Sequence, residues 1–110
     1  IVSDRTTQNG PYAIRVRDCQ EADEELKSVP ADELKQINIL GITLGERFIY
    51  ELKFFQETGK HLDAGGNWTI CSGSRYGADV PGVCWNGKME VDLGGSNSLG
   101  PWLRSRQVVF

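Results

Sequence analysis

The clearest pattern of hydrophobic and polar residues is an alternation within residues 81–95. Every second side chain is apolar, and the residues between them are chemically mixed. The apolar set is Val83, Trp85, Met89, Val91 and Leu93, and the mixed set is Cys84, Asn86, Lys88, Glu90 and Asp92. Such alternation predicts two β-strands that each bury one face. We therefore expect the odd-numbered side chains from Val83 to Leu93 to point into the protein and the even-numbered ones to be exposed.

Asn86-Gly87 separates the two apolar runs and is typical of a hairpin turn. A two-residue loop would place Trp85 opposite Lys88, which puts core and charge on one face. A loop of three residues, 86–88, instead brings apolar residues together in the pairs Trp85–Met89 and Val83–Val91. A slip of one residue would reverse every side chain. The pattern therefore predicts a three-residue loop, with Gly87 or a neighbour in the left-handed conformation as a bulge.

The strongest helical pattern runs from Leu44 to Thr58. Thr43 and Glu46 form a capping box at its start, and Gly59 supplies a left-handed residue at its end. Apolar side chains recur at helical spacing, namely Leu44, Phe48, Leu52 and Phe55 with Ile49 beside them. The other side carries Glu51, Lys53, Gln56 and Glu57. We expect this helix to bury its apolar side and to form the main helical wall of the core.

The remaining segments complete an α+β order in a single domain, residues 1–110. Residues 1–11 are expected to form an extended lead-in. Strands are predicted at residues 12–18, with Tyr12, Ile14 and Val16 on one face, at residues 67–74 and at residues 102–110. Helical segments are predicted at residues 21–29 and 30–39, and a loop at residues 75–82.

Charge and hydropathy exclude some classes of partner. The net charge is −3, and the basic residues are scattered, whereas a nucleic-acid-binding protein needs a basic stripe. No apolar run approaches the ~20 residues of a membrane span. Acidic residues gather at Glu21, Asp23, Glu24 and Glu25, which we interpret as the start of a helix. We expect neither nucleic acid nor a membrane span; the sequence leaves the oligomeric state open.

The sequence offers few groups for catalysis or metal binding. The three cysteines, Cys19, Cys71 and Cys84, form neither a disulfide framework nor a C-x-x-C pair. We expect them to be small buried hydrophobes, with Cys84 as the exception because it belongs to the mixed set. His61, the single histidine, follows a helix end, where an imidazole interacts favourably with the helix dipole. We expect no cofactor, no metal and no catalytic residue.

A set of polar and aromatic residues remains that resembles an adaptable recognition surface. Tyrosine gives rigid contact area, and Ser, Asn and Gly give small hydrogen-bonding groups. The candidate ligand-binding residues are Tyr76, Asp79, Cys84, Asn86, Glu90, Asp92, Ser96, Asn97, Ser98 and Leu99. Composition alone fits a plain exposed β-face equally well. Glu90, Asp92 and Asn97 could also offer oxygens to a calcium ion, although we favour a solvated strand face.

Two stretches, Thr69–Gly87 ("TICSGSRYGADVPGVCWNG") and Leu103–Phe110 ("LRSRQVVF"), resemble the variable proteins of diversity-generating retroelements. The helix within residues 42–63 is also similar to the one that precedes the variable segment in that family. The resemblance covers about the last two-thirds of the chain and is nearest to archaeal or archaeal-virus members. It implies a C-type-lectin-like fold in which residues 12–18 lie beside the C-terminal strand, with helices on a small twisted antiparallel sheet.

The resemblance also implies a function. Residues 70–106 would be a hypervariable segment rewritten by error-prone reverse transcription at adenines. Its exposed residues would bind a protein or cell-surface ligand without catalysis, displayed on a virion or cell surface. In that scheme, mutated Asn codons cannot yield Lys, Glu or Trp. Lys88, Glu90 and Trp102 therefore did not arise at template positions of that kind. Two alternatives stay open: a small enzyme or formylglycine-generating-enzyme-like domain with a reactive Cys71 or Cys84, and a structural domain of a surface or virion protein.

Overall fold

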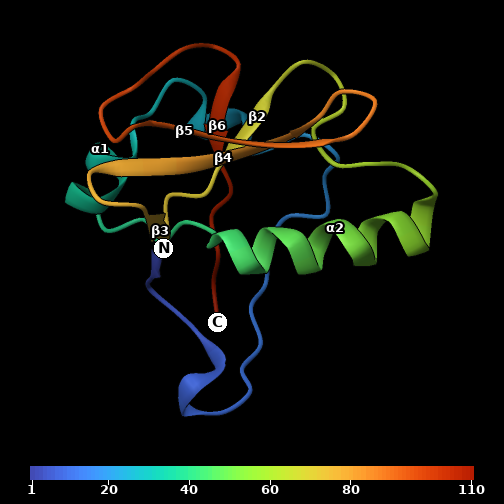
Figure 1. Cartoon of the computed structure of the whole chain (residues 1–110), viewed down its shortest axis with the longest axis horizontal. Coiled ribbons are helices and arrows are strands. Elements are labelled where there is room, and N and C mark those ends of the chain that lie inside the picture. Colours follow the sequence, from blue (N-terminus) through green and yellow to red (C-terminus); the bar gives the residue numbers. More distant parts are fainter.

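The computed structural model describes residues 1–110 and confirms an α+β fold (Figure 1). The α-helices are α1 (Ala31–Gln36) and α2 (Leu44–Thr58), and single 3-10 turns lie at η1 (Thr7–Asn9) and η2 (Glu24–Leu26). The strands are β1 (Val2–Ser3), β2 (Trp68–Ile70), β3 (Ser74–Arg75), β4 (Asp79–Trp85), β5 (Met89–Gly95) and β6 (Leu103–Ser105). Neither helix combines the length and the apolar character that crossing a membrane requires.

The main sheet has four strands in the order β5-β4-β2-β6, and α2 packs against β4. In Figure 1 both chain termini lie on the α2 side of this sheet. The pairs β2–β4 and β4–β5 are antiparallel, as predicted. Strands β2 and β6 run parallel, so the sheet is mixed and the predicted antiparallel sheet is wrong for this pair. The reason is that β6, the last strand, pairs with β2, which is far from it in sequence. It does not follow β5 as the next strand of a hairpin. A small separate sheet pairs β1 with β3.

The β4–β5 hairpin has the predicted register. Trp85 pairs with Met89 and Val83 pairs with Val91. The loop has three residues, closed by a hydrogen bond of 2.9 Å from the Asn86 N–H to the Lys88 carbonyl. Gly87 has a φ of 72°, the left-handed conformation that the bulge requires.

Burial in the hairpin follows the strand and not the parity of the residue. Strand β4 is buried on both faces from Val80 to Cys84, whereas most of β5 is exposed. The predicted burial of Val91 and Leu93 is therefore wrong, since they are 49% and 42% exposed. The predicted exposure of Cys84 is also wrong, since it is 7% exposed.

The position of each strand in the sheet explains this result. Strand β4 lies inside the sheet and has packing partners on both of its faces, whereas β5 is the edge strand. On one face Val83 joins the core cluster with Ile42, Cys71 and Val108. On the other face Trp68 and Ile70 lie over Gly82, whose added Cβ would stand 3.4 Å from each of their side chains.

Helix α2 has the predicted bounds, capping box and left-handed Gly59, but a different side is buried. Glu51, which was assigned to the polar side, is buried, and so are Arg47 and Phe54. Leu52 is 64% exposed, and Ile49 and Phe55 are exposed as well, so the predicted core assignment of these three is wrong. The cause is a buried ionic cluster beneath the helix, described below, which draws Arg47 and Glu51 inward while Lys53 and Glu57 stay exposed.

Two predicted elements of the first half are reduced in the fold. Residues 12–18 form no strand, but Ile14 and Val16 pack against the core. The expected neighbourhood with the C-terminal segment is present as one antiparallel bridge between Arg15 and Val109. Residues 21–29 form the single turn η2 instead of a helix, because Asp23 is drawn inward to accept a hydrogen bond of 2.8 Å from the Gln107 N–H.

Three predicted segments of the second half have different bounds. The strand expected over residues 67–74 is broken into β2 and the first residue of β3, Ser74. The loop expected over residues 75–82 already contains the start of β4, after a tight turn in which Tyr76 and Asp79 exchange backbone hydrogen bonds of 2.9 and 3.0 Å. The last strand, expected over residues 102–110, is β6 followed by isolated bridges, of which Gln107 forms one with Gly41.

An acidic side chain at the start of α2 fastens the N-terminal segment. The Glu46 carboxylate closes the capping box and also accepts hydrogen bonds of 2.8–2.9 Å from the Arg5 guanidinium. The Tyr12 hydroxyl donates to the same carboxylate at 2.8 Å. Burial by itself would raise the pKa of Glu46, but the hydrogen bonds from Arg5, the Thr43 backbone and Tyr12 outweigh it and lower the pKa below its ordinary value of 4.5.

We expect Glu46→Gln to lower the free energy of unfolding at pH 7 by about 2 kcal/mol, since hydrogen bonds to a charged group are lost. A lowered folded-state pKa gives stability that is present above the unfolded pKa and lost as pH falls through the folded pKa. The difference between variant and wild type should therefore shrink as the pH falls below 4.5. Urea titrations at several pH values measure it. Glu57→Gln, on the exposed side of α2, is the control and should change little; a gap that does not depend on pH contradicts the prediction.

Candidate functional site

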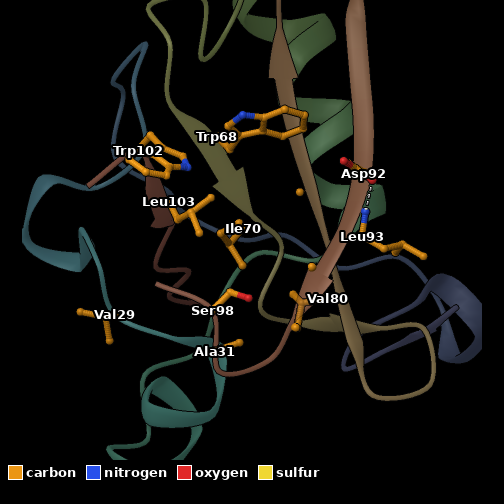
Figure 2. Close-up of a pocket in the computed structure, with 13 residues that line it drawn as sticks. Val29, Ala31, Trp68, Ile70, Val80, Asp92, Leu93, Ser98, Trp102 and Leu103 are labelled. Atoms are coloured by element: carbon orange, nitrogen blue, oxygen red, sulfur yellow. Dashed lines mark hydrogen bonds between the residues drawn. The ribbon is translucent and has the colours of Figure 1, made fainter. Parts of the chain in front are cut away.

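A half-open pocket of about 270 Å³ lies between the β5 edge and the C-terminal strand. Its lining comes from stretches far apart in sequence, and most of it is apolar (Figure 2). The lining residues are Val29, Ala31, Trp68, Ile70, Val80, Gly82, Asp92, Leu93, Gly94, Gly95, Ser98, Trp102 and Leu103. It is therefore a concave, mainly apolar site with a few polar groups, the usual character of a ligand site.

Two tryptophans form part of this pocket. The Trp68 N–H donates to the Trp102 carbonyl at 2.7 Å, so the two residues are joined through their backbones. Trp102 is 54% exposed. Its indole lies over Gly100, since a Cβ added to Gly100 would stand 3.2 Å from the Trp102 ring. Trp68 is half-buried. The pocket therefore presents accessible aromatic surface in a fixed place.

The loop after β5 is held against the start of α1. The Ser96 hydroxyl is hydrogen-bonded to the Asp32 carboxylate at 2.8 Å, and the Asp32 N–H donates to the Ser96 carbonyl at 3.0 Å. A further bond of 3.0 Å from the Ser98 N–H to the Gly95 carbonyl closes the turn. Because its loop is ordered in advance, a ligand would not have to supply that ordering free energy.

Asp92 is the only charged residue that lines the pocket. One of its oxygens accepts a hydrogen bond of 2.8 Å from the Leu93 N–H, and no cation pairs with the carboxylate. In Figure 2 the carboxylate lies on the side of β5 that faces Trp68, whereas the Leu93 side chain points away from the other labelled residues. The pocket is thus apolar with one unpaired negative charge at its rim.

The structure brings some of the predicted site residues to this pocket and leaves others away from it. Asp92 and Ser98 line it, Ser96 and Asn97 belong to the same loop, and Asp79 pairs with Gly95 at that end of the hairpin. Exposed side chains also include Tyr76 and Leu99. Asn86 lies in the hairpin loop, and Glu90 lies two residues from Asp92 in the direction of that loop. Neither residue lines the pocket. Cys84 is buried and available to no ligand.

Sequence reasoning missed most of the pocket. Trp68, Trp102 and Leu103 were assigned to strands, and Val29 and Ala31 to helical segments, with nothing to mark any of them as part of a ligand site. The single usable hint was Gly94-Gly95, because two residues without side chains leave the rim of the pocket open. The rest depends on β6 pairing with β2, a contact that no local pattern announces.

A cluster of ionisable groups lies beneath α2, and the central carboxylate of this cluster has all of its hydrogen-bonding capacity in use. Asp63 is fully buried, and its carboxylate is surrounded by donors. These donors are Arg47, Arg106, Asn67, Thr69 and the Ala22 N–H. Arg47 also bonds Glu51 at 3.2 Å. Because the Asp63 carboxylate is buried and surrounded by protein donors, it cannot contact a substrate. The cluster therefore has a structural role.

His61 belongs to the edge of this cluster. Its ring is stacked between Phe55 and Trp85, with centroid distances of 4.6 and 3.4 Å, and its Nδ1 lies 3.2 Å from the Glu51 carboxylate. Neither Cys71 nor Ser72 is hydrogen-bonded to it. The sole histidine therefore serves packing, and no nucleophile and base are paired around it.

The thiols give no support to nucleophilic chemistry. Burial raises the pKa of Cys71 to about 12 and also raises the pKa of Cys84. A catalytic cysteine needs a lowered pKa and access to solvent. The predicted burial of Cys19 is wrong, since this residue is exposed, but it lies outside the pocket.

The remaining motifs also find no site. No group of three or more His, Cys, Asp or Glu side chains converges as metal ligands would. The glycosylation sequon Asn67-Trp68-Thr69 is closed, because Asn67 is buried and its Nδ2 donates to Asp63 at 2.8 Å. Comparison with protein-family profiles, curated proteins and solved structures gave no match. Function is therefore argued from geometry.

Proposed function

We propose that the chain is a non-catalytic ligand-binding module with a C-type-lectin-like fold, and that the pocket and the exposed residues around it form its recognition surface. The observation that carries this proposal is the contrast between two neighbouring strands. Strand β4 is buried on both faces, whereas β5 and the loop after it expose most of their side chains. Residues of the exposed segment can change without disturbing the core behind them.

The residues that carry the resemblance to retroelement variable proteins support the proposal. Slightly more than half of the motif positions are buried, as expected of a scaffold, and these are Cys71, Gly73, Ser74, Val80, Pro81, Val83, Ser105, Arg106 and Val108. The positions between them that stay exposed include Tyr76, Asp79, Asp92, Asn97 and Leu99. Under this proposal residues 70–106 hold both the scaffold and the diversified positions, and the ligand is a protein or cell-surface molecule.

A triple variant tests the proposal. The whole chain is screened against arrays of immobilised proteins and glycans, together with Tyr76→Ala/Asp92→Ala/Asn97→Ala. The control is Lys53→Ala/Gln56→Ala/Glu57→Ala on the exposed side of α2. We expect both variants to melt within a few degrees of wild type, since surface substitutions change stability by about 0.5 kcal/mol or less. Binding should fall at least tenfold only in the first variant.

Two results would contradict the proposal. The first is ligand binding that survives the site variant and is lost in the α2 variant, which would place recognition elsewhere. The second comes from the surrounding nucleic acid. An adenine-rich near-copy of the segment encoding residues 70–106, beside a reverse transcriptase gene, is expected. Its absence would remove the diversification while leaving the binding pocket to be judged by the first test.

A further inference from the structure

Building on the function proposed above, we infer that the pocket receives a basic side chain, lysine or arginine, from a protein ligand. The apolar stem lies against Trp68 and Trp102, and the cationic head meets the Asp92 carboxylate. Size, charge and aromatic content each point to this occupant.

The volume suits a single long side chain. Pockets that take complete small-molecule ligands measure roughly 300–1,000 Å³, and this pocket, at about 270 Å³, lies at the lower edge of that range. It is also half-open, so the rest of a large ligand can stay outside and rest on the exposed surface of β5 and the 96–99 loop.

Charge decides which kind of side chain fits. Asp92 is the only charged residue in the lining, and no cation neutralises it. The nearest arginine in sequence to the lining residue Leu103 is Arg104, which is already engaged by Glu21 and Glu24 at 3.6 and 2.9 Å. An acidic group would be repelled by Asp92, and a neutral apolar group would gain nothing from it. A cation gains both charge attraction and hydrogen bonds.

The tryptophans strengthen the same choice. A cation near an indole face is attracted by the negative face of the ring, and tryptophan is the best aromatic partner. The aliphatic stems of lysine and arginine also bury well on apolar walls while the head stays near water. Ile70, Val80 and Leu103 provide such walls.

The test uses the ¹⁵N-labelled whole chain and the indole N–H signals of its three tryptophans. The probes are the acetylated methylamides of lysine, arginine and norleucine, the last having the lysine stem without the charge. The signals of Trp68 and Trp102 should move saturably with lysine or arginine. The Trp85 signal should stay, because Trp85 is stacked on His61 outside the pocket. Norleucine should bind at least tenfold more weakly.

Asp92→Asn should remove the preference for the charged probes, with a loss of at least tenfold. Glu57→Gln, an exposed carboxylate on α2 that does not line the pocket, should change affinity less than twofold. Equal binding of lysine and norleucine, or lysine binding that survives Asp92→Asn, overturns the basic occupant and leaves the pocket as a binding site. No movement of the Trp68 and Trp102 signals with any probe also overturns it, and the triple-variant screen then decides the proposed function separately.

Discussion

We expect that Asp63→Ala abolishes cooperative folding of this chain at 25 °C. The substitution leaves the Arg47 and Arg106 guanidiniums, 0% and 1% exposed, without the carboxylate that they share. Breaking one buried ion pair by removing a partner costs roughly 3–5 kcal/mol, and here two pairs are broken at once. A domain of this size has about 5–15 kcal/mol in total, so most or all of the stability is lost.

Backbone conformation adds to the effect. Asp63 has a φ of 55°, in the left-handed region, which Asp and Asn tolerate better than Ala does. Circular dichroism melts measure the outcome. Asp63→Asn, which keeps the shape and the left-handed tolerance but removes the charge, should lie between wild type and Asp63→Ala. Asp92→Ala, an exposed carboxylate, should melt like wild type. A cooperative transition of Asp63→Ala within about 1 kcal/mol of wild type would show that the ionic cluster does not hold the fold.

The second large effect is expected for Gly73→Ala. A Cβ on Gly73 would collide with the Gly41 carbonyl oxygen and stand 3.1 Å from the Ile42 carbonyl oxygen and the Thr43 Cγ2. These neighbours include backbone atoms that already hold the segment before α2, since the Gly73 N–H donates to the Ile42 carbonyl at 3.0 Å. Overpacking in a rigid place costs typically 1–3 kcal/mol, and more where backbone must move. We expect about 3 kcal/mol or more.

Urea unfolding gives the measurement, as a lower midpoint with an unchanged slope. Gly45→Ala is the matched control, because a Cβ on Gly45 meets nothing within 4 Å and the residue lies in the first turn of α2. Alanine is the better helix former, so this variant should gain up to about 1 kcal/mol. Equal midpoints for the two variants would contradict the prediction. They would mean that the segments around Gly73 and Gly41 move apart without loss of folding free energy.

The sequence by itself determined the features that depend on neighbours along the chain. The hairpin register follows because pairing Trp85 with Met89 is the choice that keeps apolar residues together, and a slip is not tolerated. The bounds of α2 follow because Thr43, Glu46 and Gly59 satisfy its ends locally. The α+β order of the elements follows from the same short-range periodicities.

Tertiary structure decided which surfaces are buried. Alternation predicted a buried face of β5, but Val91 is exposed because β5 is the edge strand and α2 packs against β4. Helical periodicity predicted Leu52 and Phe55 in the core, but Arg47 and Glu51 are buried instead. Arg47 pairs with Glu51 and with Asp63, and the Glu51 carboxylate lies 3.2 Å from the His61 ring nitrogen. A hydrophobicity pattern cannot register such partners, which in part come from the segment after the helix.

For the candidate site too, one part was predictable from the sequence and another part was not. The exposure of Tyr76, Asp92 and Asn97 was predictable from residue type, but the pocket was not. Its walls come from the segment before α1, from β2, from the hairpin and from β6, and they meet because β6 runs parallel to β2 across a separation of more than thirty residues. Local sequence patterns determine the secondary structure of a segment. A pocket, in contrast, forms only where segments that are distant in sequence leave a space between them.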